Sequence, residues 1–292
     1  MTYLTPITRF FFSGVQSNMH ENISFGDVIL RQITEEELLQ HLHISNRVTD
    51  DQGRLLSCKV HGGRVPSGAE FFDELEKITL RGCTHVFVSE LPIEEHRSAI
   101  NDIIHCWRLL RMSRVACPVT YNSTSPSIDF MYPLEGSLGD RLQFDSTLLD
   151  ETLKLLPEIR RIPQEDLDLI DLANKTGPNT LTVFLLVVIA ERSLMEGDEH
   201  EISFKVAVFG SLLLKALGIV DTRAAVSVLR RAYKIRSAFA HGGKVSHTGI
   251  TDLLPCLYKY VSIIRRHTAL HPDAVTAEGK NSLLFGKRNQ PG

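Results

Sequence analysis

The periodicity of the apolar residues changes once along this chain of 292 residues, close to Pro133. Before that point, short runs rich in Val, Ile and Phe alternate with polar residues, a pattern typical of β-strands. Helical spacing appears at 94–112, and a capping box that opens at Thr34 predicts a helix over 34–43. The predicted strands are 27–33, 54–61, 84–90, 114–121 and 127–132. The first half is therefore expected to form a mixed α/β domain over residues 1–135.

After the turn-rich stretch 133–139, the pattern is helical. Residues 180–195 are apolar on nearly every face, which indicates a helix in the centre of a bundle. Three more helices are predicted, at 201–217, 222–241 and 251–267. The predicted fold class is α+β, with the mixed domain followed by an all-α helical bundle over 145–270.

The last two segments of the chain carry two further expectations. Pro255 is expected in the first turn of the final helix, where a missing amide removes no helical hydrogen bond. Residues 271–292 are rich in Pro, Gly, Asn and Lys, and they are expected to form a flexible basic tail.

The composition limits the classes of protein that this chain can belong to. Apolar residues make up 43% and charged residues 23%, as in folded globular proteins. The longest apolar run, 183–190, is far shorter than the roughly 20 residues of a membrane-spanning helix, and the first residues do not form a signal peptide. The five cysteines are scattered without a C-x-x-C pair, which argues against a disulfide framework or a zinc site. We expect a cytoplasmic protein with reduced thiols, no membrane association, no metal and no cofactor.

Charge is distributed unevenly along the chain. Residues 1–150 hold 13 Lys and Arg against 20 Asp and Glu, a balance of −7, and residues 151–221 have a balance of −5. Residues 222–292 hold 12 Lys and Arg against 3 Asp and Glu, a balance of +9. A basic segment of this kind is either a solvated face or tail, or a surface that binds a polyanion such as RNA.

The predicted helix 222–241 carries two stripes of side chains. A basic and polar stripe has the spacing of four, three and four residues that places side chains on one helix face, and it consists of Arg230, Lys234, Ser237 and His241. The neighbouring stripe holds Leu229, Tyr233 and Ala240, and its missing member is Arg236. A charge at an apolar position is paired, serves an interface or site, or extends its head into water along an apolar stem.

Arg236 and His241 are five residues apart, which separates them by about 140° around a regular helix. One copy of the helix does not bring them together easily. A second copy packed antiparallel would place both groups at a shared cleft, so the spacing favours a homodimeric site. A histidine at this place also has a simpler explanation, because a cation stabilises the C-terminal end of a helix.

The segment Arg236-Ser-Ala-Phe-Ala-His241 resembles the R-x4-6-H motif of the HEPN superfamily. Its wider context, with Glu191, the stretch 201–204 and the stretch 233–243, is similar to the Apea-like branch found in bacterial proteins, over roughly residues 175–265. The stretch 33–38 resembles the region that precedes such domains, and no chemistry is attached to it.

This resemblance implies a metal-independent endoribonuclease with Arg236 and His241 as the catalytic pair. The RNA 2'-OH would attack the adjacent phosphate and leave a 2',3'-cyclic phosphate and a 5'-OH end. Ser237 would orient a phosphate or the histidine, and Glu191 would pair with Arg236 or serve an ordinary cap or ion pair. The implied RNA-binding residues are Arg230, Lys234 and Lys244.

The resemblance also implies a biological setting, and it leaves one alternative open. The substrate would be single-stranded or tRNA-like RNA, and such domains resemble toxins and antiphage defence effectors. A phage- or host-derived trigger would be sensed by the N-terminal domain. The alternative is a non-catalytic HEPN-like module that dimerises, binds nucleotide or RNA and regulates another protein, and the acidic N-terminal half favours it. The pair His41 and His43 lacks a third ligand at a useful spacing, so it does not predict a metal site.

Overall fold

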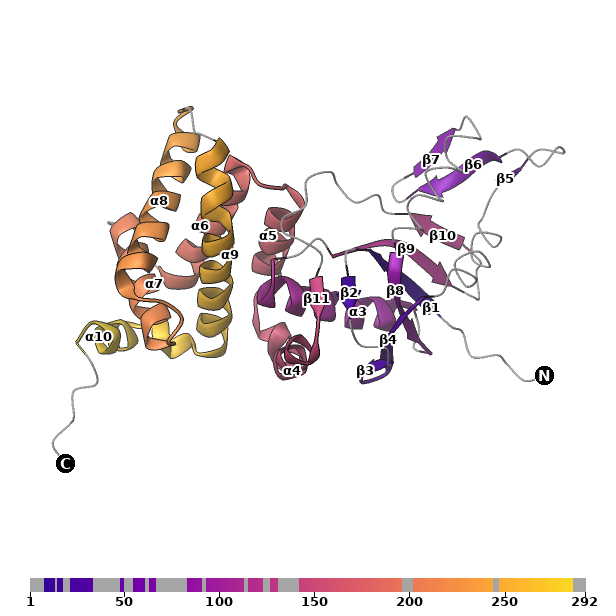
Figure 1. Ribbon diagram of the computed structural model, residues 1–292, viewed down its shortest axis with the longest axis horizontal. Helices are drawn as coiled ribbons and strands as arrows, with labels where there is room; N and C mark the ends of the chain where they lie inside the picture. Colours follow the sequence, from indigo (N-terminus) through magenta and orange to yellow (C-terminus); the bar gives the residue numbers. More distant parts are fainter. Residues whose placement is uncertain are drawn as a thin grey trace. The chain divides into compact units, whose positions relative to one another are not determined.

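The computed structural model describes residues 8–13, 15–17, 22–33, 48–49, 55–60, 63–66, 83–90, 93–112, 115–122, 127–130, 142–195, 202–243 and 247–285. It has an α+β architecture made of two compact units (Figure 1). The sheet unit comprises Met1–Ile104, Ser113–Leu134 and Asp140–Leu153. The helical unit comprises His105–Met112, Glu135–Gly139 and Lys154–Gly292.

The sheet unit is built on a nine-stranded sheet in the order β3-β4-β8-β1-β9-β10-β6-β5, with β7 paired to β6. All of these pairings are antiparallel except β10 with β6, and a separate parallel pair joins β2 to β11. The rings of Phe87 and Phe144 lie edge-on to that of Phe25 in its core, with centroid distances of 6.1 and 6.3 Å. The strands are β1 (Thr8–Ser13), β2 (Val15–Ser17), β3 (Ile23–Phe25), β4 (Val28–Gln32), β5 (Val48–Thr49), β6 (Leu55–Val60), β7 (Gly63–Pro66), β8 (Cys83–Ser89), β9 (Ala116–Asn122), β10 (Ser127–Phe130) and β11 (Leu142–Phe144).

The five predicted strands are confirmed as β4, β6, β8, β9 and β10, and the helix predicted at 94–112 is α3 (Ile93–Leu110). The strand β1, which lies between β8 and β9, is not predicted by the sequence pattern. Three consecutive phenylalanines, Phe10 to Phe12, hide the alternation that identifies a strand. The helix predicted at 34–43 lies outside the described residues.

The helical unit is a bundle in which α6 packs against α5, α8 and α9. Val183, Leu186 and Ile189 of α6 are fully buried, which confirms that this helix is central. Of the described helices, none is both long and apolar enough to cross a membrane. The helices that follow the sheet are α4 (Ser146–Leu155), η1 (Leu156–Arg161), α5 (Gln164–Lys175), α6 (Thr180–Leu194), α7 (Ile202–Ala216), α8 (Thr222–Ala240), α9 (His247–Leu270), η2 (Pro272–Val275) and α10 (Ala277–Phe285).

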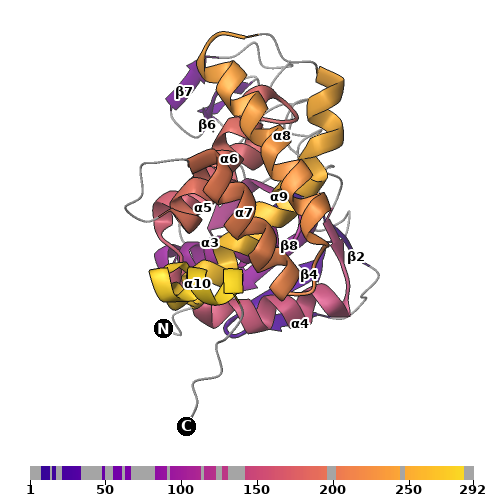
Figure 2. The same cartoon turned by 90° about the vertical axis from the view of Figure 1, so that its left-hand side faces the viewer.

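The prediction of a flexible basic tail at 271–292 is wrong for residues 272–285, which form η2 and α10. The Thr276 hydroxyl accepts a hydrogen bond from the Gly279 amide at 3.2 Å and so caps α10. A side chain at Gly279 would overlap the carbonyl of Asp273, so this close approach requires glycine. The helix packs against α7 (Figure 2), and Lys280 Nζ lies 5.5 Å from the ring centroid of Phe209.

Two boundaries also differ from the sequence predictions. The sheet unit extends to Leu153, beyond the predicted boundary at 133–139, because β11 pairs with β2. The last long helix begins at His247, so Pro255 lies inside it and not in its first turn. Pro255 is exposed, and water can replace the helical hydrogen bond that its missing amide cannot make.

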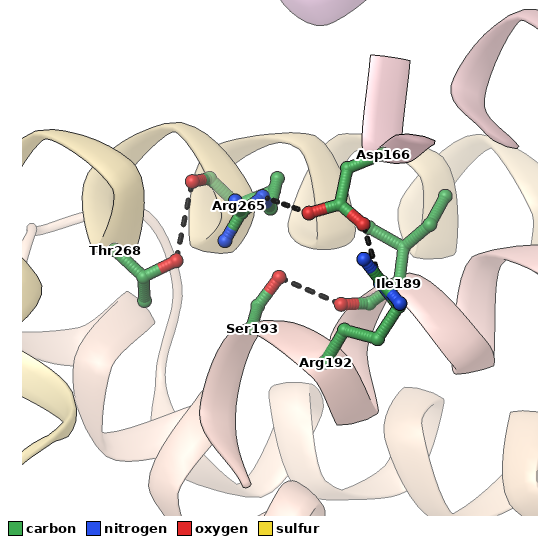
Figure 3. Close-up of polar contacts among 6 residues, drawn as sticks. All are labelled: Asp166, Ile189, Arg192, Ser193, Arg265 and Thr268. Carbon is green, nitrogen blue, oxygen red and sulfur yellow. Dashed lines mark hydrogen bonds and ion pairs between the residues drawn. The ribbon is translucent and has the colours of Figure 1, made fainter. Parts of the chain in front are cut away.

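One buried carboxylate joins three helices of this bundle (Figure 3). Asp166 of α5 is almost fully buried and faces two guanidinium groups. Arg192 Nε of α6 lies 2.6 Å from one carboxylate oxygen, and Arg265 Nε of α9 lies 2.8 Å from the other. Burial lowers the pKa of the Arg265 guanidinium, and the charge of Asp166 opposes that shift. Removing the carboxylate would leave Arg265 buried beside a second positive charge.

We expect Asp166→Asn to lower the free energy of unfolding by about 3 kcal/mol, since it leaves a buried charge without compensation. Asp168→Asn is the matched control, because Asp168 is exposed on the same helix and bonds only to the Gln164 side chain among the described residues. The control should cost less than about 0.5 kcal/mol. Urea denaturation followed by circular dichroism measures both values. Equal losses of unfolding free energy in the two variants would show that the ion pairs of Asp166 with Arg192 and Arg265 do not stabilise the fold.

Candidate functional site

The helix α8 carries most of the candidate site. The Asp221 carboxylate caps its start by accepting hydrogen bonds from the amides of Arg223 and Ala224, at 2.9 and 3.2 Å. The helix ends at Ala240, and Gly242 then adopts a φ of +71°, a left-handed conformation that favours glycine. The predicted stop at the two glycines is confirmed, and His241 is left at the C-cap.

The predicted basic stripe is exposed in the structure. Arg230, Lys234, Ser237 and His241 all lie on the solvent-facing side of α8. On the other side of the helix, Leu229 is buried in the bundle core. Lys244 lies outside the described residues.

Arg236 is partly buried, with 32% of its side chain exposed, and it pairs with Glu191 of α6. One guanidinium nitrogen of Arg236 lies 3.7 Å from the Glu191 carboxylate oxygen Oε1. The Tyr233 hydroxyl donates a hydrogen bond to that same oxygen. Burial and then this hydrogen bond raise the pKa of the Tyr233 phenol, so the phenol is held in its protonated form. Glu191 is therefore shared by two side chains that lie one turn apart on α8.

Aromatic rings frame the guanidinium of Arg236. Its Cζ atom lies 5.7 Å from the ring centroid of Phe184 on α6 and 5.8 Å from that of Tyr233. Phe239 packs against Phe184 with a centroid distance of 5.7 Å and an interplanar angle of 60°. Cations are attracted to ring faces at these distances. Within the described part of the chain, nothing accepts a hydrogen bond from the buried Nε of Arg236.

Arg236 and His241 are not in contact within one chain. The ion pair of Arg236 is directed to α6, whereas His241 is exposed at the helix end, five residues further on. The two side chains leave α8 in directions about 140° apart, as the helical spacing requires. A single chain thus presents an oriented arginine and an accessible histidine on different sides of one helix.

The sequence motif predicted Arg236, Glu191, Ser237 and His241 as site residues, but the aromatic rings around Arg236 were not predicted. Phe184 is hidden in the apolar run of α6, and Phe239 stands inside the motif itself. Tyr233 had the clearest signal, since it precedes Arg236 by three residues and therefore shares its helix face.

Metal-ligating side chains do not gather in the part of the chain that the structure describes: no group of three or more His, Cys, Asp or Glu forms there. His41 and His43 lie outside that part. No protein-family model, no curated protein and no solved structure matches this chain.

We expect Tyr233→Phe to lower the free energy of unfolding by about 1–2 kcal/mol at neutral pH, because it removes a hydrogen bond to a charged carboxylate. The pKa of Tyr233 is raised by folding, so the wild type should lose this advantage as pH rises above about 10, where the unfolded chain ionises first. Denaturation of both proteins at several pH values gives this difference. A difference that stays constant to pH 12 would contradict the assigned hydrogen bond.

Proposed function

We propose that this chain is a metal-independent endoribonuclease of the HEPN type, with Arg236 and His241 as its catalytic pair. One observation carries the proposal. The arginine of the R-x4-6-H motif is held by Glu191 and framed by aromatic rings, while the histidine of the same motif is exposed at the helix end. An arginine with no role beyond solubility would extend its head into water.

The proposed reaction is an internal transesterification of RNA. The 2'-oxygen forms a bond to the adjacent phosphorus as the bond to the 5'-oxygen breaks, which gives a 2',3'-cyclic phosphate and a 5'-OH end. The planar guanidinium of Arg236 donates hydrogen bonds to the phosphate oxygens as charge builds up on them. His241 transfers a proton from the 2'-OH or to the leaving 5'-oxygen, since imidazole changes charge near neutral pH.

The surrounding residues suit the binding of RNA phosphates. Ser237 shares the exposed stripe with His241 and can donate its hydroxyl to a phosphate oxygen. Arg230 and Lys234 supply positive charge on the same face, and Lys244 adds another in the sequence. The balance of +9 over residues 222–292 supports a polyanionic ligand.

The proposed working form is a homodimer. The 140° offset between Arg236 and His241 separates them in one chain, and two antiparallel copies of α8 bring the arginine of one copy to the histidine of the other. The proposed setting is a cytoplasmic toxin or antiphage defence effector, in which the N-terminal domain senses a phage- or host-derived trigger. The second candidate is a non-catalytic HEPN-like regulatory module, which the balance of −7 over residues 1–150 favours because that half repels RNA.

We expect Arg236→Ala and His241→Ala each to lower RNA cleavage by at least a hundredfold to ten-thousandfold, the range typical of losing acid-base or charge stabilisation. Chelation with EDTA should leave the wild-type rate unchanged. Arg223→Ala and His271→Ala are matched controls, because both residues are exposed and lie outside the site. Labelled RNA and gel analysis of the product ends measure the rates and the chemistry. Wild-type rates in the His241→Ala variant would exclude its catalytic role and favour the regulatory module.

A mixing experiment tests whether the site is shared. Arg236→Ala and His241→Ala proteins are inactive alone, but a mixed dimer holds one intact shared site. After subunit exchange at equal concentrations, we expect activity to return to about a quarter of the wild-type value, since half of the dimers are mixed and each has one working site of two. Light scattering of the mixture measures whether the two variants form dimers. No recovery in an exchanging dimer would place both residues of each site in one chain.

A further inference from the structure

Phe239 is an exposed aromatic side chain inside the motif, and catalysis as proposed makes no use of it. Its side chain is 43% exposed, and it lies in the last turn of α8. Exposure of a phenylalanine gives up the free energy that burial would provide. Leu181 is also exposed on α6, one turn before Phe184, so the apolar surface continues beyond the two rings.

Phe184 connects this surface to Arg236, the phosphate-binding group of the proposed site. The ring centroid of Phe184 lies 5.7 Å from that of Phe239 and also 5.7 Å from the guanidinium carbon of Arg236. A partly exposed ring therefore lies close to a cation whose side chain is also partly exposed. An unstacked base beside its own phosphate has the complementary pair of features, a flat π surface and a negative charge.

We propose that Phe239, supported by Phe184, is a nucleobase-stacking subsite, so the substrate is single-stranded RNA with an unstacked base next to the scissile phosphate. This inference rests on the proposed function in one respect, the binding of phosphate by Arg236. A base in a duplex is already stacked on both faces and cannot cover the ring of Phe239. The occupant is a nucleobase, because the partly exposed guanidinium of Arg236 beside Phe184 can bind the negative charge of the phosphate attached to it.

The test uses the full-length protein and a probe that cannot be cleaved. The probe is a single-stranded RNA with 2'-O-methyl groups in place of its 2'-hydroxyls and with 2-aminopurine at one position, which loses fluorescence when it stacks. We expect the wild type to quench the probe and Phe239→Ala to bind it about ten- to a hundredfold more weakly. A duplex of the same sequence should compete poorly.

Two further variants separate stacking from simple apolar contact. Phe239→Tyr keeps a ring and should restore affinity and quenching, whereas Phe239→Leu keeps an apolar side chain and should restore neither. Phe204→Ala is the matched control, since Phe204 is 52% exposed in the first turn of α7 and should leave probe binding unchanged. Circular dichroism of each variant confirms that the bundle is folded.

Several outcomes would overturn the subsite. The first is that the wild type does not quench the fluorescence of the probe. The second is that the Phe239→Leu variant binds and quenches the probe as well as the wild type does. A third is loss of the dimer in Phe239→Ala without RNA, because the ring would then be covered by a second copy of the chain. Failure of the proposed nuclease is a separate result. If quenching depends on the Phe239 ring but the matching strand with 2'-hydroxyls is not cleaved, the stacking subsite stands and the proposed ribonuclease activity is wrong.

Discussion

The helical unit depends on how the buried helix α6 accommodates its only two charges, Glu191 and Arg192. These neighbours stand near the end of a helix whose other residues are almost all apolar. The side chain of Glu191 is largely buried and that of Arg192 is about half exposed, and both pair with opposite charges on other helices. Glu191 pairs with Arg236 on α8, and Arg192 pairs with Asp166, which also meets Arg265 on α9. Two successive residues of α6 thus connect this helix to three others, and the ion pair with Glu191 holds the candidate arginine against α6.

This constraint links the bundle to the proposed chemistry. A guanidinium held by Glu191 and two rings loses little conformational freedom when a phosphate arrives, because its position is already set by the core. The ion pair occupies only one of the guanidinium nitrogens of Arg236, which lies 3.7 Å from the Glu191 oxygen Oε1. That oxygen also accepts the hydrogen bond of the Tyr233 hydroxyl. The Glu191 carboxylate thus orients the guanidinium of Arg236 but does not contact all of its nitrogens.

The periodicity of the sequence predicted the features that a single helix or strand determines by itself. These are the central position of α6, the exposed stripe of α8 and the unusual place of Arg236 on an apolar stripe. It failed where a neighbour decides the structure. The strand β1 has no alternation and is defined by its pairing with β8 and β9. Helix α10 forms where a flexible tail was expected, because Thr276 caps its first turn and the helix packs against α7. Tyr233 and Glu191 are 42 residues apart, so no local pattern reveals their hydrogen bond.

The site stands at the C-terminal end of α8, and this position imposes an electrostatic requirement. Helix N-termini bind phosphates through free amides and a positive dipole end, whereas a C-terminus presents carbonyl oxygens and a negative end that repel anions. A phosphate bound beside His241 must therefore be held by side-chain cations, with no backbone amides to share the charge. Under the proposed function, that requirement would be met by Arg230, Lys234 and Arg236, which lie in the last three turns of the helix.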